Sequence, residues 1–146
     1  MPKKITNLKK GHSKKFAPND KEKYMCAKQK KFFTNELLRW KRDIVKSNTL
    51  SNILNSGDDN VSSADMVDQA TSLTDKSVEM RSLNRSRKLI AKINSALQRI
   101  KDGTYGFCEE TGEPIGLKRL MARPVAKYTI AAQEKHEKDE KVHADD

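Results

Sequence analysis

The hydrophobic residues in the first half of the chain recur at the spacing of a helix. Phe33, Leu37, Trp40 and Ile44 follow one another at steps of four, three and four residues. This spacing lines up one apolar stripe along a helical surface. No Pro or Gly interrupts the stretch. The pattern therefore predicts a helix from Lys28 to about Asn55.

A second apolar stripe occupies residues 62–101. Its second half holds a heptad frame formed by Leu83, Ile90, Ile93, Leu97 and Ile100. The sequence Ser-Ser-Ala-Asp at 62–65 fits a capping box, and Asp-Gly at 102–103 has the residue types that end a helix. We therefore expect a second helix that begins at Ser62 or Ser63 and ends near Lys101.

The segment between the two predicted helices favours a chain reversal. Residues 56–60 read Ser-Gly-Asp-Asp-Asn, which suits turns and helix ends better than a continued helix. Two helices joined by so short a connection pack as an antiparallel pair. At about 1.5 Å per residue they are roughly 40 to 60 Å long. Because this is longer than the rest of the chain can be wide, the turn end is expected to project into solvent.

The remaining residues predict a small globular part. Residues 105–116 have the pattern of a tight hairpin around a Thr-Gly turn, residues 117–122 that of a short helix, and Ala126 to about Lys141 that of a final helix. The expected core consists of Tyr105, Phe107, Ile115, Leu117, Leu120, Ile130 and Ala131. The predicted fold is mainly α: a long antiparallel helical hairpin, or coiled coil, projects from a small globular part with a zinc-finger-like knuckle and a C-terminal helix.

Charge is distributed unevenly along the chain. The net charge of the 146 residues is +10, of which residues 1–46 contribute +11, residues 47–75 contribute −5 and residues 76–146 contribute +4. The hairpin therefore has an acidic tip, at residues 56–70, and a basic base. A strong positive balance indicates an acidic partner, such as nucleic acid or an acidic protein surface.

Composition divides the chain into three parts and indicates a cytoplasmic protein. Residues 1–20 carry paired lysines and few apolar side chains, which predicts a flexible basic tail. The hairpin then occupies residues 21–103, and the knuckle with the C-terminal helix occupies 104–146. Two isolated cysteines do not form a disulfide framework, and no apolar run is long enough to cross a membrane. The hairpin buries its own seam, so we expect a monomer.

Two motifs resemble the DksA/TraR proteins. The sequence YGFCEETGEPIGLKRLMARP at residues 105–124 is similar to the zinc-finger region of that family. Residues 65–70, Asp-Met-Val-Asp-Gln-Ala, match the family's Asp-x-x-Asp-x-Ala tip motif, at the place where the apolar pattern independently predicts the tip. The resemblance extends from residue 22 to about residue 140.

The resemblance implies a regulator of transcription that is not an enzyme. In such a protein the hairpin enters the secondary channel of RNA polymerase, brings Asp65, Asp68 and Ala70 close to the catalytic centre and modulates initiation. Small acidic groups suit a pore that ends at Mg²⁺ and basic side chains. The alternative is that Asp65 and Asp68 only cap the second helix, which is worth about 0.3 to 1 kcal/mol each. Capping does not explain the match at Ala70.

Basic residues of the second helix have implied roles as well. Arg85, Arg87 and Lys88 would dock to the polymerase rim, although they also suit a solvated basic face. The family forms a site for the alarmone ppGpp at the polymerase interface, and the matching basic positions here are Lys92 and Arg123. Gln133 occupies a third position that is basic in the family. Two of three cations can still bind phosphate, but more weakly.

The zinc motif of the family is incomplete in this chain. The four positions that hold its cysteines read Cys108, Thr111, Thr129 and Ala132. A structural zinc ion needs four such ligands at tetrahedral geometry, so the sequence predicts no metal and no other cofactor apart from ppGpp. The acidic residues 109 and 110 beside Cys108 predict an unreactive thiol.

Two other functions are compatible with the sequence. A transcript-cleavage factor also uses an acidic hairpin tip, to position a second Mg²⁺ for hydrolysis, but its hairpin precedes a β-rich domain. A basic protein that binds nucleic acid through its tail and helices would fit the net charge. The acidic tip does not favour that function, and no sequence-specific DNA binding is expected.

Overall fold

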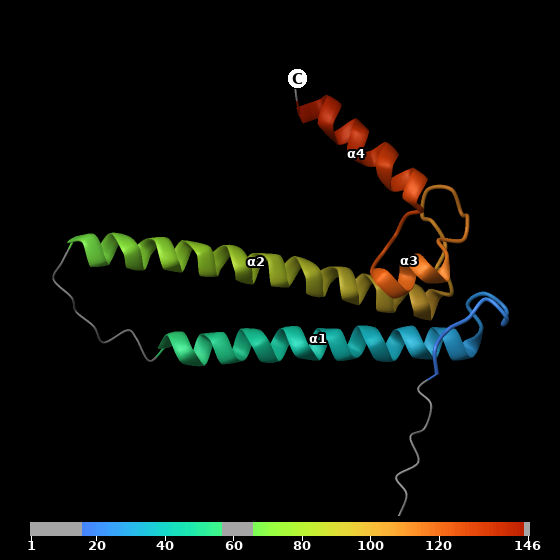
Figure 1. The fold of residues 1–146 in the computed structure, drawn as a ribbon, viewed down its shortest axis with the longest axis horizontal. Coiled ribbons are helices and arrows are strands. Elements are labelled where there is room, and N and C mark those ends of the chain that lie inside the picture. The colour runs from blue at the N-terminus through green and yellow to red at the C-terminus, as the bar shows by residue number, and fades with distance from the viewer. Residues whose placement is uncertain (1–15, 57–65, 145–146) are drawn as a thin grey trace, which may run out of the picture.

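The fold is a long helical hairpin with a small globular end. A computed structural model describes residues 16–56 and 66–144, which contain the helices α1 (Ala27–Ser56), α2 (Met66–Asp102), α3 (Leu117–Ala122) and α4 (Ile130–Ala144). Helices α1 and α2 run antiparallel side by side, α3 lies against the base of the hairpin, and α4 extends away from it (Figure 1). The predicted fold class is confirmed. The capping box predicted at residues 62–65 lies outside the described residues.

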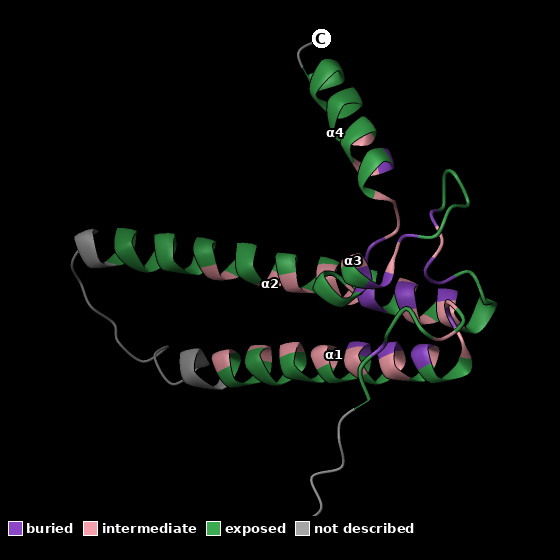
Figure 2. Ribbon diagram, turned by 45° about the vertical axis from the view of Figure 1, so that its right-hand side comes forward, coloured by how far each residue is buried: buried purple, intermediate pink, exposed green. Residues whose placement is uncertain are grey.

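The core of the hairpin lies at its base. Phe33 and Leu37 of α1 and Ile93 and Ala96 of α2 are fully buried. Toward the other end the residues of α1 and α2 are mostly exposed or half-buried, as the colours in Figure 2 show. The apolar side chains exposed there, each 47–68% accessible, are Val45, Leu50, Leu73, Val78 and Met80. Packing therefore holds the two helices together at the base rather than evenly along their length.

The knuckle packs on the base of the hairpin through Tyr105. Its ring is fully buried, 5.6 Å from that of Phe33, and its hydroxyl donates a 2.7 Å hydrogen bond to the Pro124 carbonyl oxygen. The predicted hairpin of 105–116 is reduced to an isolated antiparallel bridge between Phe107 and Pro114. The side chains of Leu117 and Leu120 on α3 complete this part of the core.

Helix α4 begins later than predicted, at Ile130 rather than at Ala126. Val125 and Ala126, which precede α4, are packed in the core, where each is 5% exposed. Thr129 then starts the helix, because its hydroxyl accepts a hydrogen bond from the Ala132 amide at 3.4 Å. The prediction that Ile130 and Ala131 belong to the core is wrong: both are exposed, Ile130 by 60%.

The segment that precedes α1 is folded against it. Pro18 is buried, and the fully buried side chain of Gln29 donates to the Asn19 carbonyl oxygen at 3.2 Å and accepts from the Met25 amide at 2.8 Å. Residues 16–20, which were expected to belong to a flexible tail, thus lie on α1, whereas residues 1–15 are outside the described part. None of the described helices is both long and apolar enough to span a membrane.

Candidate functional site

A basic cleft lies where α2, α3 and the start of α4 meet. It has a volume of about 250 Å³, and four cationic residues line it: Lys92, Arg119, Arg123 and Lys127. Tyr128 and Gln133 complete its polar lining. The structure thus brings the predicted pair Lys92 and Arg123 together, and Gln133, at the third position, lies in the same cleft. We call it the basic cleft.

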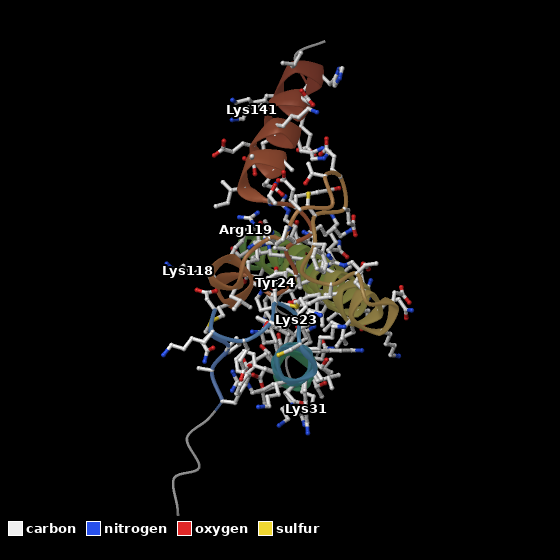
Figure 3. The ribbon with its side chains drawn as sticks, turned by 90° about the vertical axis from the view of Figure 1, so that its right-hand side faces the viewer. Lys23, Tyr24, Lys31, Lys118, Arg119 and Lys141 are labelled. Carbon is white, nitrogen blue, oxygen red and sulfur yellow. The ribbon has the colours of Figure 1, made fainter. Side chains whose placement is uncertain are left out.

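Two residues of the basic cleft were missed by the sequence analysis. Arg119 donates from Nε to the Tyr128 carbonyl oxygen at 3.0 Å, which holds α3 to the segment before α4. Figure 3 shows Arg119 between α3 and α4. Lys127 lies on that segment. The available signal was weak: Arg119 and Arg123 are four residues apart, which places them on one side of a helical turn.

The predicted docking residues lie on the exposed surface of α2. Arg85, Arg87 and Lys88 are all open to solvent. They lie between the start of α2 and Lys92, so one helix carries Ala70, the predicted docking residues and one wall of the basic cleft. The structure places these side chains where a partner can reach them.

The predicted tip residues are only partly covered by the structure. Asp65 lies outside the described residues. Asp68 is within the first turn of α2, and Ala70 is exposed on the same helix. Ala70 and Lys92 are separated by 22 positions of α2, which is about 33 Å at a rise of about 1.5 Å per residue. The tip and the basic cleft are therefore well separated along the hairpin.

The four positions of the incomplete zinc motif surround a buried thiol. Cys108 is 3% exposed, Ala132 is 5% exposed, and Thr129 starts α4. Burial raises the pKa of the Cys108 thiol, but hydrogen bonds from the Thr111 hydroxyl and from backbone amides, those of Thr111 and Thr129 among them, outweigh it and lower the pKa to about 7. The prediction of an unreactive thiol overlooked these donors.

The two acidic neighbours of Cys108 form ion pairs with other residues. Glu109 lies 3.8 Å from the Nε atom of the buried Arg99. Glu110 accepts from Lys135 at 3.3 Å and from His136 at 2.9 Å, and the hydrogen bond from Lys135 is the main reason why the pKa of Glu110 is lowered. Glu110 therefore joins the knuckle to α4 instead of acting on the thiol.

Comparisons with known proteins match almost the whole chain. Residues 29–100 match the family described as DnaK suppressor protein DksA, N-terminal domain, and residues 103–138 match the prokaryotic dksA/traR C4-type zinc finger. The RNA polymerase-binding transcription factor DksA of Caulobacter vibrioides is 46% identical over 90% of this chain and 92% of its own length. The Escherichia coli protein of that name is 35% identical over 75% of this chain and 72% of its own length.

A solved structure has a similar fold. The structure of transcription factor DksA2 from Pseudomonas aeruginosa superposes with a TM-score of 0.69 and is 38% identical. The match covers 81% of this chain and 90% of that one. The likeness therefore includes the hairpin and the globular end together.

The prediction that the chain carries no zinc is contradicted by the family match. Residues 103–138 match a C4-type zinc finger, and membership of that family indicates zinc binding. The donor set of this chain differs from four cysteines, because Cys108 is the one thiol among the four positions. Among residues 16–56 and 66–144, no group of three or more His, Cys, Asp or Glu side chains is arranged to hold a metal ion. The residues present at these four positions therefore do not form a C4 zinc site.

Proposed function

The chain belongs to the DksA/TraR family, and from this premise we propose that it binds RNA polymerase and regulates transcription by inserting its helical hairpin into the secondary channel. The resemblance found in the sequence is confirmed by the family matches. Its relatives are transcription factors. We propose that this chain, like them, acts by binding and not by catalysis, in the cytoplasm where polymerase works.

The main support for the proposal is that one helix, α2, extends from the tip region to the base of the hairpin. Ala70 near one end of α2 and Lys92 near the other are about 33 Å apart at about 1.5 Å per residue. A rigid helix of that length can reach a buried catalytic centre while the globular end stays at the channel entrance. Asp65, Asp68 and Ala70 would then perturb the active centre during initiation.

The surface of α2 between these points suits docking. Arg85, Arg87 and Lys88 are exposed and cationic. An acidic rim around the channel would attract them and set the depth of insertion, because complementary charge steers association and fixes orientation. We therefore propose these three residues as the docking surface.

The basic cleft is the proposed place for ppGpp. Lys92 and Arg123 come from α2 and from the end of α3, and Arg119 and Lys127 add two further cations to the same cleft. Arginine binds phosphate with two parallel hydrogen bonds, and lysine adds a point charge. The additional cations offset the neutral Gln133, so we propose that the cleft still binds the alarmone when polymerase covers it.

The test separates docking from the effect of the tip. Binding to purified core RNA polymerase and initiation in vitro are measured for the wild type, for Asp68→Asn and for Asp75→Asn, a control change at an exposed acid of the same helix. We expect all three to bind, Asp68→Asn alone to lose its effect on initiation, and the combined change Arg85→Gln, Arg87→Gln to weaken binding. Absence of wild-type binding would overturn the proposal.

A transcript-cleavage assay on stalled polymerase distinguishes the main alternative. A regulator of initiation leaves the rate of cleavage unchanged. A cleavage factor raises the rate in a Mg²⁺-dependent manner, since its acids hold a second metal ion.

A further inference from the structure

A groove on the far side of α1 has no part in the proposed function. It has a volume of about 610 Å³ and combines the cations Lys28, Lys31, Arg39 and Arg42 with the aromatic rings of Phe16 and Phe32. Figure 3 shows Lys31 projecting from the side of α1 that faces away from α2. We call this surface the α1 groove. It lies at the base of the hairpin, far from the tip.

The aromatic part of the α1 groove is formed by two segments. Phe16 comes from the residues before α1 and meets Phe32 edge to face, with ring centroids 6.2 Å apart. Phe32 is anchored in turn against the fully buried Phe33, at 5.3 Å. The ring of Phe16 remains 37% exposed. One ring is therefore held in place by the core while the other offers an open face.

The cationic part of the α1 groove is only partly neutralised. Arg39 pairs with Glu36 at 2.6 Å, and Lys28 lies 3.8 Å from Glu22. Within the described part of the chain, Lys31 and Arg42 have no acidic partner. Two unpaired cations thus lie on the same groove as the exposed ring.

We propose that the α1 groove binds single-stranded nucleic acid. Cations that contact phosphates, together with aromatic rings on which bases stack, are the combination that binds single strands without sequence preference. Lys28 and Arg42 are 14 positions apart on α1, about 21 Å at about 1.5 Å per residue, which is enough for a few nucleotides.

An acidic protein segment is the competing occupant, and the open ring of Phe16 argues against it. Carboxylates would satisfy the cations but would leave that ring without a stacking partner, whereas a base covers it. The proposal does not depend on polymerase binding, so the two can fail separately.

The test uses the full chain without polymerase. Fluorescence anisotropy of a labelled oligouridylate of roughly 12 nucleotides, and of the matching oligothymidylate, measures binding over a range of salt concentrations. The groove variants are Lys31→Gln combined with Arg42→Gln, and Phe16→Ala. The matched control is Lys138→Gln combined with Lys141→Gln, which removes the same charge from the exposed surface of α4.

We expect binding by the wild type and losses confined to the groove variants. The double charge variant should weaken binding about five-fold or more and reduce the slope of log K against log salt by about 1.4, that is about 0.7 for each lost phosphate contact. Phe16→Ala should weaken binding about five-fold or more without changing the slope. The control should stay within about two-fold of the wild type.

Three results would overturn the proposal. The wild type could fail to bind either oligonucleotide. The groove variants could bind as the control does, which would assign binding to net charge or to the lysines of residues 1–15. A polyglutamate peptide could displace the oligonucleotide at equal charge concentration, which would identify an acidic protein as the occupant. Circular dichroism of each variant establishes that the helices remain folded.

Discussion

The hydroxyl of Tyr24 donates a 2.6 Å hydrogen bond to the carbonyl oxygen of Gly106, 82 positions later in the chain. The hydroxyl oxygen of Tyr24 in turn accepts a hydrogen bond from the Gly116 amide at 3.1 Å. Burial raises the pKa of Tyr24, so its hydroxyl remains protonated and able to donate. One side chain from the segment before α1 thus forms hydrogen bonds to both ends of the knuckle.

Replacing Tyr24 with Phe should destabilise the protein. The change removes one donor and one acceptor and leaves the Gly106 carbonyl and the Gly116 amide without this partner, which should lower the free energy of unfolding by about 1 to 2 kcal/mol. Urea denaturation followed by circular dichroism measures it. Tyr128→Phe is the control, because Tyr128 contributes its backbone carbonyl and its ring, and both survive that change. Equal losses in the two variants would contradict the assignment.

Gly106 should not tolerate a side chain. Its φ of +87° is one that L residues rarely adopt, and an added Cβ would lie 2.9 Å from the Met25 Cγ atom. Gly103 has a similar φ of +79° but nothing within 4 Å of an added Cβ. Gly103→Ala should therefore cost about 1 kcal/mol for its backbone alone. Gly106→Ala should cost about 1 to 3 kcal/mol more, since overpacking adds to the same backbone cost.

Urea midpoints of the two glycine variants provide the measurement. The comparison cancels most of the backbone contribution, because both positions have positive φ. If Gly103→Ala is the more destabilising change, the Met25 side chain does not lie against Gly106 as the structure shows.

Stability of the hairpin should depend on its base and not on its distal half. Ile93 is fully buried, and Ile93→Ala should cost about 2 to 5 kcal/mol, with Ile93→Val at about 0.5 to 1.5 kcal/mol as a milder variant that stays folded. Val78 on the same helix is 57% exposed, so Val78→Ala should cost less than about 0.5 kcal/mol. Urea denaturation measures all three. A comparable loss at Val78 would mean that the distal helices pack together in solution.

The helices of the hairpin could be predicted from apolar spacing, whereas the start of α4 could not. Phe33 and Leu37 belong to the apolar stripe of α1 and Ile93 to that of α2, and all three are buried where the helices meet. Apolar spacing does not predict which apolar residues of a loop become buried in the core. Val125 and Ala126 fill the core as part of the connection to α4, and this leaves Ile130 on the surface.

Residues of the basic cleft could be predicted from the sequence only where they fall on positions of the family resemblance. Lys92 and Arg123 were selected by resemblance. Arg119 and Lys127 had only a weak signal or none in the sequence, and they reach the basic cleft because the fold brings α3 and the segment before α4 to the same place as Lys92. The low pKa of Cys108 was also out of reach. The pKa is lowered by the Thr111 hydroxyl and by backbone amides that the fold brings to the sulfur, and not by the charges of the sequence neighbours.

Helix α4 should loosen when Glu110 loses its charge. Glu110 binds both Lys135 and His136, and Ala132 is the one buried residue of that helix. Glu110→Gln should increase amide hydrogen exchange in α4 and leave exchange at the base of α1 and α2 unchanged. Glu113→Gln, an exposed acid on the same turn, is the control. Unchanged exchange in α4 would show that Ala132 alone holds it.

Placing a lysine at Gln133 should strengthen ppGpp binding. Gln133 lines the basic cleft, and its amide donates to Glu137 at 2.9 Å, a contact that a lysine ammonium can replace. A fifth cation beside Lys92 and Arg123 should raise the affinity of the complex with polymerase for ppGpp about three- to ten-fold, since a charged hydrogen bond to phosphate is stronger than one from a neutral amide. Titration of labelled ppGpp measures it. The control is Lys118→Gln, on α3 but outside the cleft lining. If Gln133→Lys leaves the affinity for ppGpp unchanged while Arg123→Gln abolishes binding, the alarmone contacts the α3 side of the cleft alone. If neither change alters the affinity, ppGpp does not bind in this cleft.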